Sequence, residues 1–162
     1  MTLGPRTFAS AAEGLCAFYE EEISGEAFFS TLASFHSGEA SKALGLMSSI
    51  EGAMLQALAP MAKRLGVDPA RVAAIRAEGQ REAEALRGLG WHDLLRRMCE
   101  EYPVFVAEFE AVAKAADEAE RTDAQLLLDH EVALLDFATA ALAGRKDCLQ
   151  ILEGFQIGRA HV

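Results

Sequence analysis

Apolar residues return at every third or fourth position through most of this chain, which is the spacing of one face of an α-helix. The two-residue alternation of a half-buried strand is not sustained anywhere along it. We therefore expect an all-α fold: one domain over residues 1–162, built as an antiparallel four-helix bundle with its core at about 10–143. The long helices are predicted near 10–36, 39–65, 92–116 and 118–142, and residues 145–162 are predicted to form one short helix and a tail.

Glycine and proline mark the ends and bends of these helices. Gly66 occupies the glycine position that commonly follows a helix, here the second one. Asp68 and the proline after it open segment 69–87, which has little apolar face and is predicted to be a solvated crossover helix between the second and third long helices. Pro60 should bend the second helix, and Pro103 either bends the third helix or divides it into two pieces.

The charge of the chain excludes some classes of partner. Its 15 basic and 25 acidic residues leave a formal net charge of −10 at pH 7. Such a negative field repels phosphate backbones and anionic lipid surfaces, so we expect neither nucleic acid nor membrane as a partner. The longest nearly uncharged stretch, 43–62, has Glu51 near its centre, which favours a buried bundle helix over a membrane span.

Cysteine usage and the N-terminal residues indicate the compartment. Cys16, Cys99 and Cys148 are odd in number and far apart, which is typical of small buried side chains in a reducing environment. The first ten residues lack the apolar run of a signal peptide. We therefore expect a cytoplasmic protein.

Glutamates interrupt the apolar stripes of the predicted helices. Glu22, Glu51 and Glu131 each lie at the centre of an otherwise apolar stripe, where an uncompensated charge costs several kcal/mol. In the first helix this stripe is Leu15, Tyr19, Glu22, Glu26, Phe29 and Leu32. The third helix offers Glu101 or Glu108, which lie seven residues apart on the edge of its stripe. We expect one glutamate from each long helix to meet at one level of the bundle, unless the stripe edges leave them in solvent.

This pattern resembles the ferritin-like superfamily, in particular its rubrerythrin-like members, over about residues 10–143. The resemblance is carried by Glu22 with Phe29 seven positions later, by Glu51 and Glu131 on the second and fourth helices, and by the long crossover. It implies a site for two iron or two manganese ions, with a glutamate on each of two helices and a Glu-x-x-His on each of the other two.

The histidines of that motif are missing. Met54 and Leu134 stand three residues after Glu51 and Glu131, at the positions where the resemblance implies imidazole ligands. His130 precedes Glu131 by one residue, and one residue is a rotation of about 100°, so we expect its ring to point away from that glutamate's face. A surface or hydrogen-bonded structural role is the simpler interpretation of His130.

Two functions from different classes follow. In the first, Glu22, Glu51, Glu131 and Glu101 or Glu108 hold iron or manganese in a redox or oxygenase-like centre, and the bundle core admits oxygen or a small apolar ligand. In the second, the protein is a metal-free scaffold for binding or interaction, and facing carboxyl groups share a proton with a raised pKa. Iron storage in a large shell is a third, less favoured class. A homodimer is expected in any of the three cases.

Overall fold

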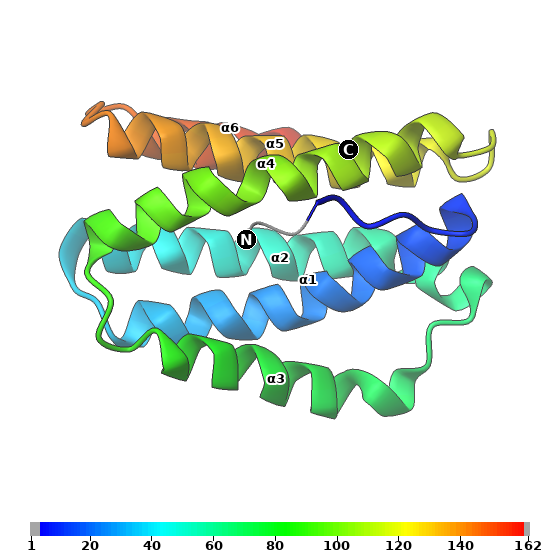
Figure 1. Cartoon of the computed structure of the whole chain (residues 1–162), viewed down its shortest axis with the longest axis horizontal. Helices are drawn as coiled ribbons and strands as arrows, with labels where there is room; N and C mark the ends of the chain where they lie inside the picture. Colours follow the sequence, from blue (N-terminus) through cyan, green and yellow to red (C-terminus); the bar gives the residue numbers. More distant parts are fainter. Residues whose placement is uncertain (1–3, 161–162) are drawn as a thin grey trace. The chain divides into compact units, whose positions relative to one another are not determined.

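The computed structural model describes residues 4–160 and the side chains up to Gln156. The described residues form six α-helices and one short 3-10 turn, and no strand occurs among them, which confirms the predicted all-α class (Figure 1). The elements are α1 (Ala11–Ser34), α2 (Gly38–Leu65), η1 (Pro69–Arg71), α3 (Val72–Ala85), α4 (Trp91–Ala115), α5 (Arg121–Leu142) and α6 (Leu149–Ala160). The end of the predicted tail, including His161, lies outside the described residues.

The helices belong to two compact units. One unit is Cys16–Trp91, with most of α1 and all of α2, η1 and α3. The other is Met1–Leu15 with His92–Val162, and it holds the start of α1, nearly all of α4, and α5 and α6. The four-helix bundle and the single domain remain predictions, and each unit is described by itself below.

In the unit 16–91, α1 and α2 pack as neighbours. The hydroxyl of Ser48 on α2 donates a hydrogen bond of 3.0 Å to the backbone carbonyl of Glu26 on α1. Of the predicted α2 stripe, Leu44, Met47, Glu51, Met54, Leu58 and Met61 are buried, whereas its last member, Leu65, is only partly buried. Pro60 lies inside α2 without ending it, and Gly66 follows in the left-handed conformation with φ of 79°. Any bend at Pro60 stays a prediction.

The predicted crossover segment lies against α1. Asp68 caps it as expected, because its carboxylate accepts a 2.9 Å hydrogen bond from the backbone N–H of Ala70. Only Gly79 and Ala83 of α3 are buried, in agreement with the predicted solvated helix. A Cβ on Gly79 would lie 2.2 Å from the backbone oxygen of Ser24, so the missing side chain lets α3 approach α1 closely. The Arg87 guanidinium lies over the ring of Phe35, with 4.1 Å between the guanidinium carbon and the ring centroid.

In the unit formed by 1–15 and 92–162, the structure decides between alternatives for α4 and shifts the start of α5. α4 is one continuous helix through Pro103, so the alternative of two separate pieces is wrong. α5 begins at Arg121 rather than 118, because Asp117 forms a turn in which its side chain and its carbonyl both accept from the N–H of Glu120. The short C-terminal helix is confirmed as α6, which packs on α5.

Candidate metal centre

Two buried glutamates meet between α1 and α2. Glu22 is 3% exposed and Glu51 is 4% exposed. A carboxylate oxygen of one lies within 4.8 Å of a carboxylate oxygen of the other, close enough for a single cation to contact both. The sequence predicted that these two glutamates converge, and within the unit 16–91 that prediction is confirmed.

The helices leave room for this pair. Gly25 lies on α1, and a Cβ at this position would come within 3.1 Å of the carboxylate carbon of Glu51. The glycine hydrogen therefore gives the Glu51 head group a place against the α1 backbone. Small residues at a helix contact let the two backbones approach, and here that approach brings the carboxylates together.

The buried face of α1 is rotated slightly from the predicted stripe. Leu15, Glu22, Phe29 and Leu32 are buried as expected, but Tyr19 and Glu26 lie at the edge and are partly exposed. Phe18 takes the core position next to Glu22 in place of Tyr19. The physical reason is that 3.6 residues per turn allows two adjacent stripes, and the Phe18 ring, which has no hydroxyl group, is buried at a lower desolvation cost than Tyr19.

On α5 the predicted site residue Glu131 is buried, and so is His130 at 1% exposure. The surface interpretation of His130 is therefore wrong. Its ring lies 6.0 Å from the ring of Phe155 between centroids, so α6 covers a second face of α5. Adjacent positions on one helix can both be buried when partners pack on two sides, a condition that the α5 pattern alone does not reveal. Whether Glu131 reaches the level of Glu22 and Glu51 stays a prediction.

On α4 the two candidate glutamates have different environments. Glu108 is 2% exposed, whereas the Glu101 side chain is 42% exposed and pairs with Arg97 at 2.8 Å on the same helix. Glu101 is thus a solvated surface residue and lies outside the buried set. The buried position on α4 belongs to Glu108.

Glu108 already has a partner of opposite charge. The Arg6 guanidinium donates hydrogen bonds of 2.8 and 3.1 Å to Oε2 of Glu108, and the backbone N–H of Arg6 donates one of 2.7 Å to Oε1. Such charge-assisted, two-nitrogen contacts compensate the negative charge of a buried carboxylate. The sequence pattern does not identify Arg6 as a partner, because no helical period connects it with a residue 102 positions later.

The residues near Arg6 make further contacts at the start of α1. Glu13 accepts a 2.8 Å hydrogen bond from the N–H of Ala9, and Ser10 accepts one of 3.1 Å from the N–H of Glu13, so both side chains help to cap the start of α1. The Arg6 guanidinium also lies 5.3 Å from the ring centroid of Phe8. This signal was present in the sequence as Ser-x-x-Glu at 10–13 and could have been used to place the first helix boundary.

The donor set of the Glu22–Glu51 pair suits a hard cation. Carboxylate oxygens are ligands that iron, manganese and magnesium accept. Met54 and Leu134, at the positions where the resemblance implies histidines, are both buried and offer no hard ligand. The pair fits a cation held mainly by oxygen, and it does not fit the full histidine-containing ligand set.

Comparisons of this chain with protein-family models, with curated proteins and with solved structures find no match. Among the described residues, no helix combines the length and the apolar character needed to cross a membrane.

Proposed function

We propose that Glu22 and Glu51 form the carboxylate part of an iron or manganese site in a ferritin-like redox protein. The observation that supports this proposal most strongly is the closeness of two buried carboxylates from two different helices. The ferritin-like bundle, the homodimer and the cytoplasmic location expected from the sequence belong to the same proposal.

Electrostatics explain why such a pair calls for a cation. Two unit charges about 5 Å apart repel each other by about 3 kcal/mol at an effective dielectric constant near 20, and burial adds a desolvation cost to each. A bound divalent ion removes this repulsion, and so does a proton shared between the two groups. Metal and proton are therefore competing solutions for the same pair of carboxylates.

The choice of ion follows from the donors. Soft thiolates are absent from the pair, and carboxylates without several imidazoles favour manganese or iron over copper. The sequence supplies Glu131 and His130 as candidates for the remaining ligands, and both side chains are buried on α5. A bound iron or manganese ion would supply electron transfer or oxygen chemistry, while Glu22 and Glu51 would hold the ion and shield it from bulk water.

A second candidate function is a metal-free scaffold that binds a partner molecule. The Arg6–Glu108 pair favours it, because one carboxylate predicted to be a metal ligand is already neutralised by a cation of the chain itself. The substitution of both motif histidines by Met54 and Leu134 points the same way. Under this candidate function the Glu22–Glu51 pair is kept nearly neutral by a shared proton.

Metal content and metal response separate the two functions. The protein is purified without chelator or affinity metal, analysed for its elements, and then titrated anaerobically with ferrous iron and with manganese while thermal stability is followed. If the site binds metal, iron or manganese raises the Tm of the parent, and Glu51→Gln abolishes the rise. Glu82→Gln, an exposed glutamate on α3 of the same unit, is the matched control and keeps the full response.

The opposite result identifies the scaffold. In that case the titration leaves Tm unchanged, and Glu51→Gln has a stability equal to or above that of the parent, because an amide removes the carboxylate repulsion. Glu131→Gln and His130→Ala are titrated in parallel. Each variant that weakens the metal response is assigned as a ligand, and a variant that folds and keeps the response is removed from the ligand set.

A further inference from the structure

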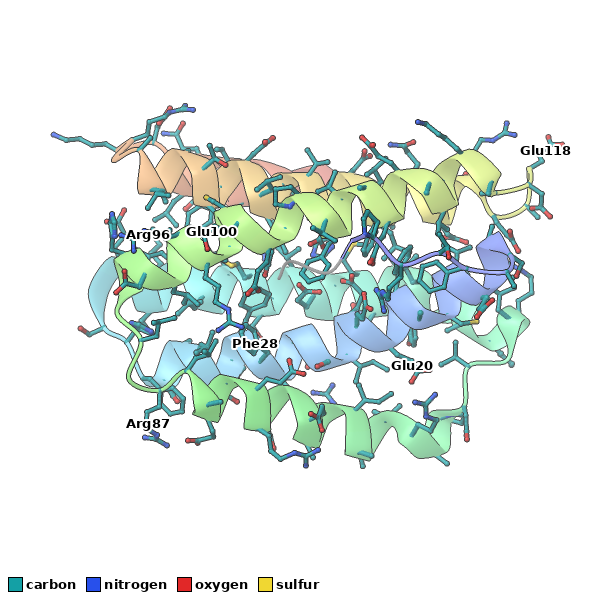
Figure 2. The ribbon with its side chains drawn as sticks, in the orientation of Figure 1. Glu20, Phe28, Arg87, Arg96, Glu100 and Glu118 are labelled. Atoms are coloured by element: carbon teal, nitrogen blue, oxygen red, sulfur yellow. The ribbon has the colours of Figure 1, made fainter. Side chains whose placement is uncertain are left out.

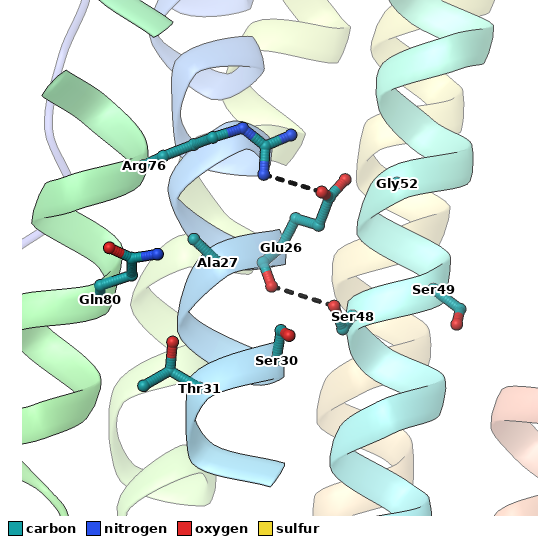
Figure 3. Close-up of a pocket in the computed structure, with 9 residues that line it drawn as sticks. All are labelled: Glu26, Ala27, Ser30, Thr31, Ser48, Ser49, Gly52, Arg76 and Gln80. Carbon is teal, nitrogen blue, oxygen red and sulfur yellow. Dashed lines mark hydrogen bonds and ion pairs between the residues drawn. The ribbon is translucent and has the colours of Figure 1, made fainter. Parts of the chain in front are cut away.

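A polar pocket lies in the unit 16–91, where α1, α2 and α3 come together (Figure 3). Its volume is about 360 Å³, and α1, α2 and α3 each contribute to its walls. The described residues that line it include serines, a threonine, a glutamine and an ion pair, and no aromatic residue. Neither carboxylate of the Glu22–Glu51 pair lines this pocket, so what it binds is a separate question from the metal site.

The ion pair at the pocket joins Arg76 to Glu26, and the missing side chain of Gly52 leaves room for it. The Arg76 guanidinium on α3 donates a 2.9 Å hydrogen bond to Oε1 of Glu26 on α1. The other oxygen of Glu26 lies where Gly52 of α2 has no side chain, since a Cβ there would be 2.9 Å from it. Gly52 thus creates the space in which the Glu26 carboxylate meets Arg76, and Figure 3 shows these residues around one cavity.

The charges of the pocket balance, which determines the class of ligand. Glu26 and Arg76 neutralise each other, so an added ion would have to break their contact or leave a charge uncompensated. An anion is disfavoured further by the net charge of −10 on the chain. A neutral ligand that exchanges hydrogen bonds can enter while the ion pair stays intact.

Hydrogen-bonding groups remain available on the walls. Among the described residues, the side chains of Ser30, Thr31 and Gln80 take part in no hydrogen bond, and Arg76 uses only one of its nitrogens on Glu26. These groups offer both donors and acceptors, as a ligand with several hydroxyl groups requires. The volume lies within the range of small-molecule sites.

We propose that this pocket binds a small neutral polyol. The hydroxyl groups of such a molecule pair with Ser30, Thr31 and Gln80, and one further hydroxyl accepts from a guanidinium nitrogen of Arg76 that is not bonded to Glu26. The absence of an aromatic wall among the described lining residues favours a polyol over a flat aromatic ligand, which would need a stacking partner.

The test uses the full-length chain labelled with ¹⁵N, titrated with myo-inositol and with glycerol while backbone amide resonances are followed. We expect saturable shifts at residues of the pocket with millimolar affinity, and none at the α5–α6 contact. Gly52→Ala should weaken binding roughly tenfold, because the added methyl group displaces Glu26 from Arg76. Gly45→Ala on the same helix is the matched control, since its Cβ would have no atom within 4 Å, and its affinity should equal that of the parent.

A second variant, at an exposed position, tests the proposal even if the glycine variant misfolds. Gln80 is exposed on α3, so Gln80→Ala should keep the fold and still weaken polyol binding by a few-fold. The proposal is overturned if no amide shifts, if the shifts are the same in Gly52→Ala and Gln80→Ala as in the parent, or if sodium acetate or a lysine salt produces the same saturable shifts as the polyols.

Discussion

The protein contains two buried carboxylate arrangements that neutralise negative charge in different ways. In the unit 16–91, Glu22 faces Glu51, so a carboxylate meets a carboxylate. In the other unit, Glu108 faces Arg6, and a guanidinium and a backbone N–H complete its hydrogen bonds. The second arrangement carries its own cation, whereas the first brings two groups of like charge together, which is why we propose a cation or a shared proton there.

This difference shows why burial of a glutamate does not by itself identify a metal ligand. Glu22, Glu51 and Glu108 are buried to nearly the same degree. Only the partner distinguishes a site that can accept an ion from one that is already satisfied. The chain also holds exposed pairs, such as Glu20 with Arg71 between α1 and η1, whose Glu20 side chain is labelled in Figure 2.

The largest effect is expected from Arg6→Ala. Removing the guanidinium leaves the Glu108 carboxylate buried beside a single backbone donor, and because Arg6 is itself half-exposed we expect a loss of about 1–3 kcal/mol rather than the full cost of a buried pair. Urea unfolding at neutral pH measures it. Arg71→Ala, which breaks the exposed pair with Glu20, should cost less than about 1 kcal/mol.

A double-mutant cycle tests whether Glu108 is the cause. In a Glu108→Gln background, Arg6→Ala should cost clearly less than in the parent, because no buried charge is then stranded. Equal costs in both backgrounds would show that Arg6 acts only through packing on Phe8, and the contrast between the two carboxylate arrangements would fail.

An intermediate effect is expected at Gly25, which leaves room for the Glu51 carboxylate. Gly45→Ala should stabilise α2 by about 0.5–1 kcal/mol through helix propensity alone. Gly25→Ala gains the same helix propensity on α1, but its methyl group is in steric conflict with the Glu51 carboxylate. We therefore expect this variant to be at least about 1 kcal/mol less stable than Gly45→Ala. Chemical denaturation of the two variants measures the difference, and equal stabilities would mean that the Glu51 carboxylate can move away freely.

The smallest effect is expected for the exposed pair before α6. The Arg145 guanidinium donates hydrogen bonds of 3.0 and 2.8 Å to Asp147 and lowers the pKa of that carboxyl below 3.8. A lowered folded-state pKa contributes stability above the unfolded-state pKa, and this contribution is lost as the pH falls through the folded-state pKa. Asp147→Asn should therefore be marginally less stable than the parent near neutral pH and equal to it in strong acid. A difference as large as that of Arg6→Ala would remove the distinction between buried and exposed pairs.

Local signals in the sequence predicted the helices well. Gly66 and Asp68 act on their own neighbours, through a left-handed residue and a side-chain cap, so the boundary they mark is already present in the local sequence. The same holds for the α2 stripe, where one periodic pattern identifies the buried face. The choice between Glu101 and Glu108 could not be made in this way, because residues seven apart lie on nearly the same helix face.

By itself the sequence determined the all-helical class, most helix limits and the burial of Glu22, Glu51 and Glu131, because propensity, capping and apolar periodicity act over a few residues. Tertiary structure alone decided that Glu51 lies against Gly25 within reach of Glu22, that Phe155 of α6 lies near the His130 ring, and that Arg6 pairs with Glu108. These contacts join residues far apart in the chain, and no local period records them. The charge partner of a buried carboxylate is such a contact, and it separates a candidate metal ligand from a satisfied ion pair.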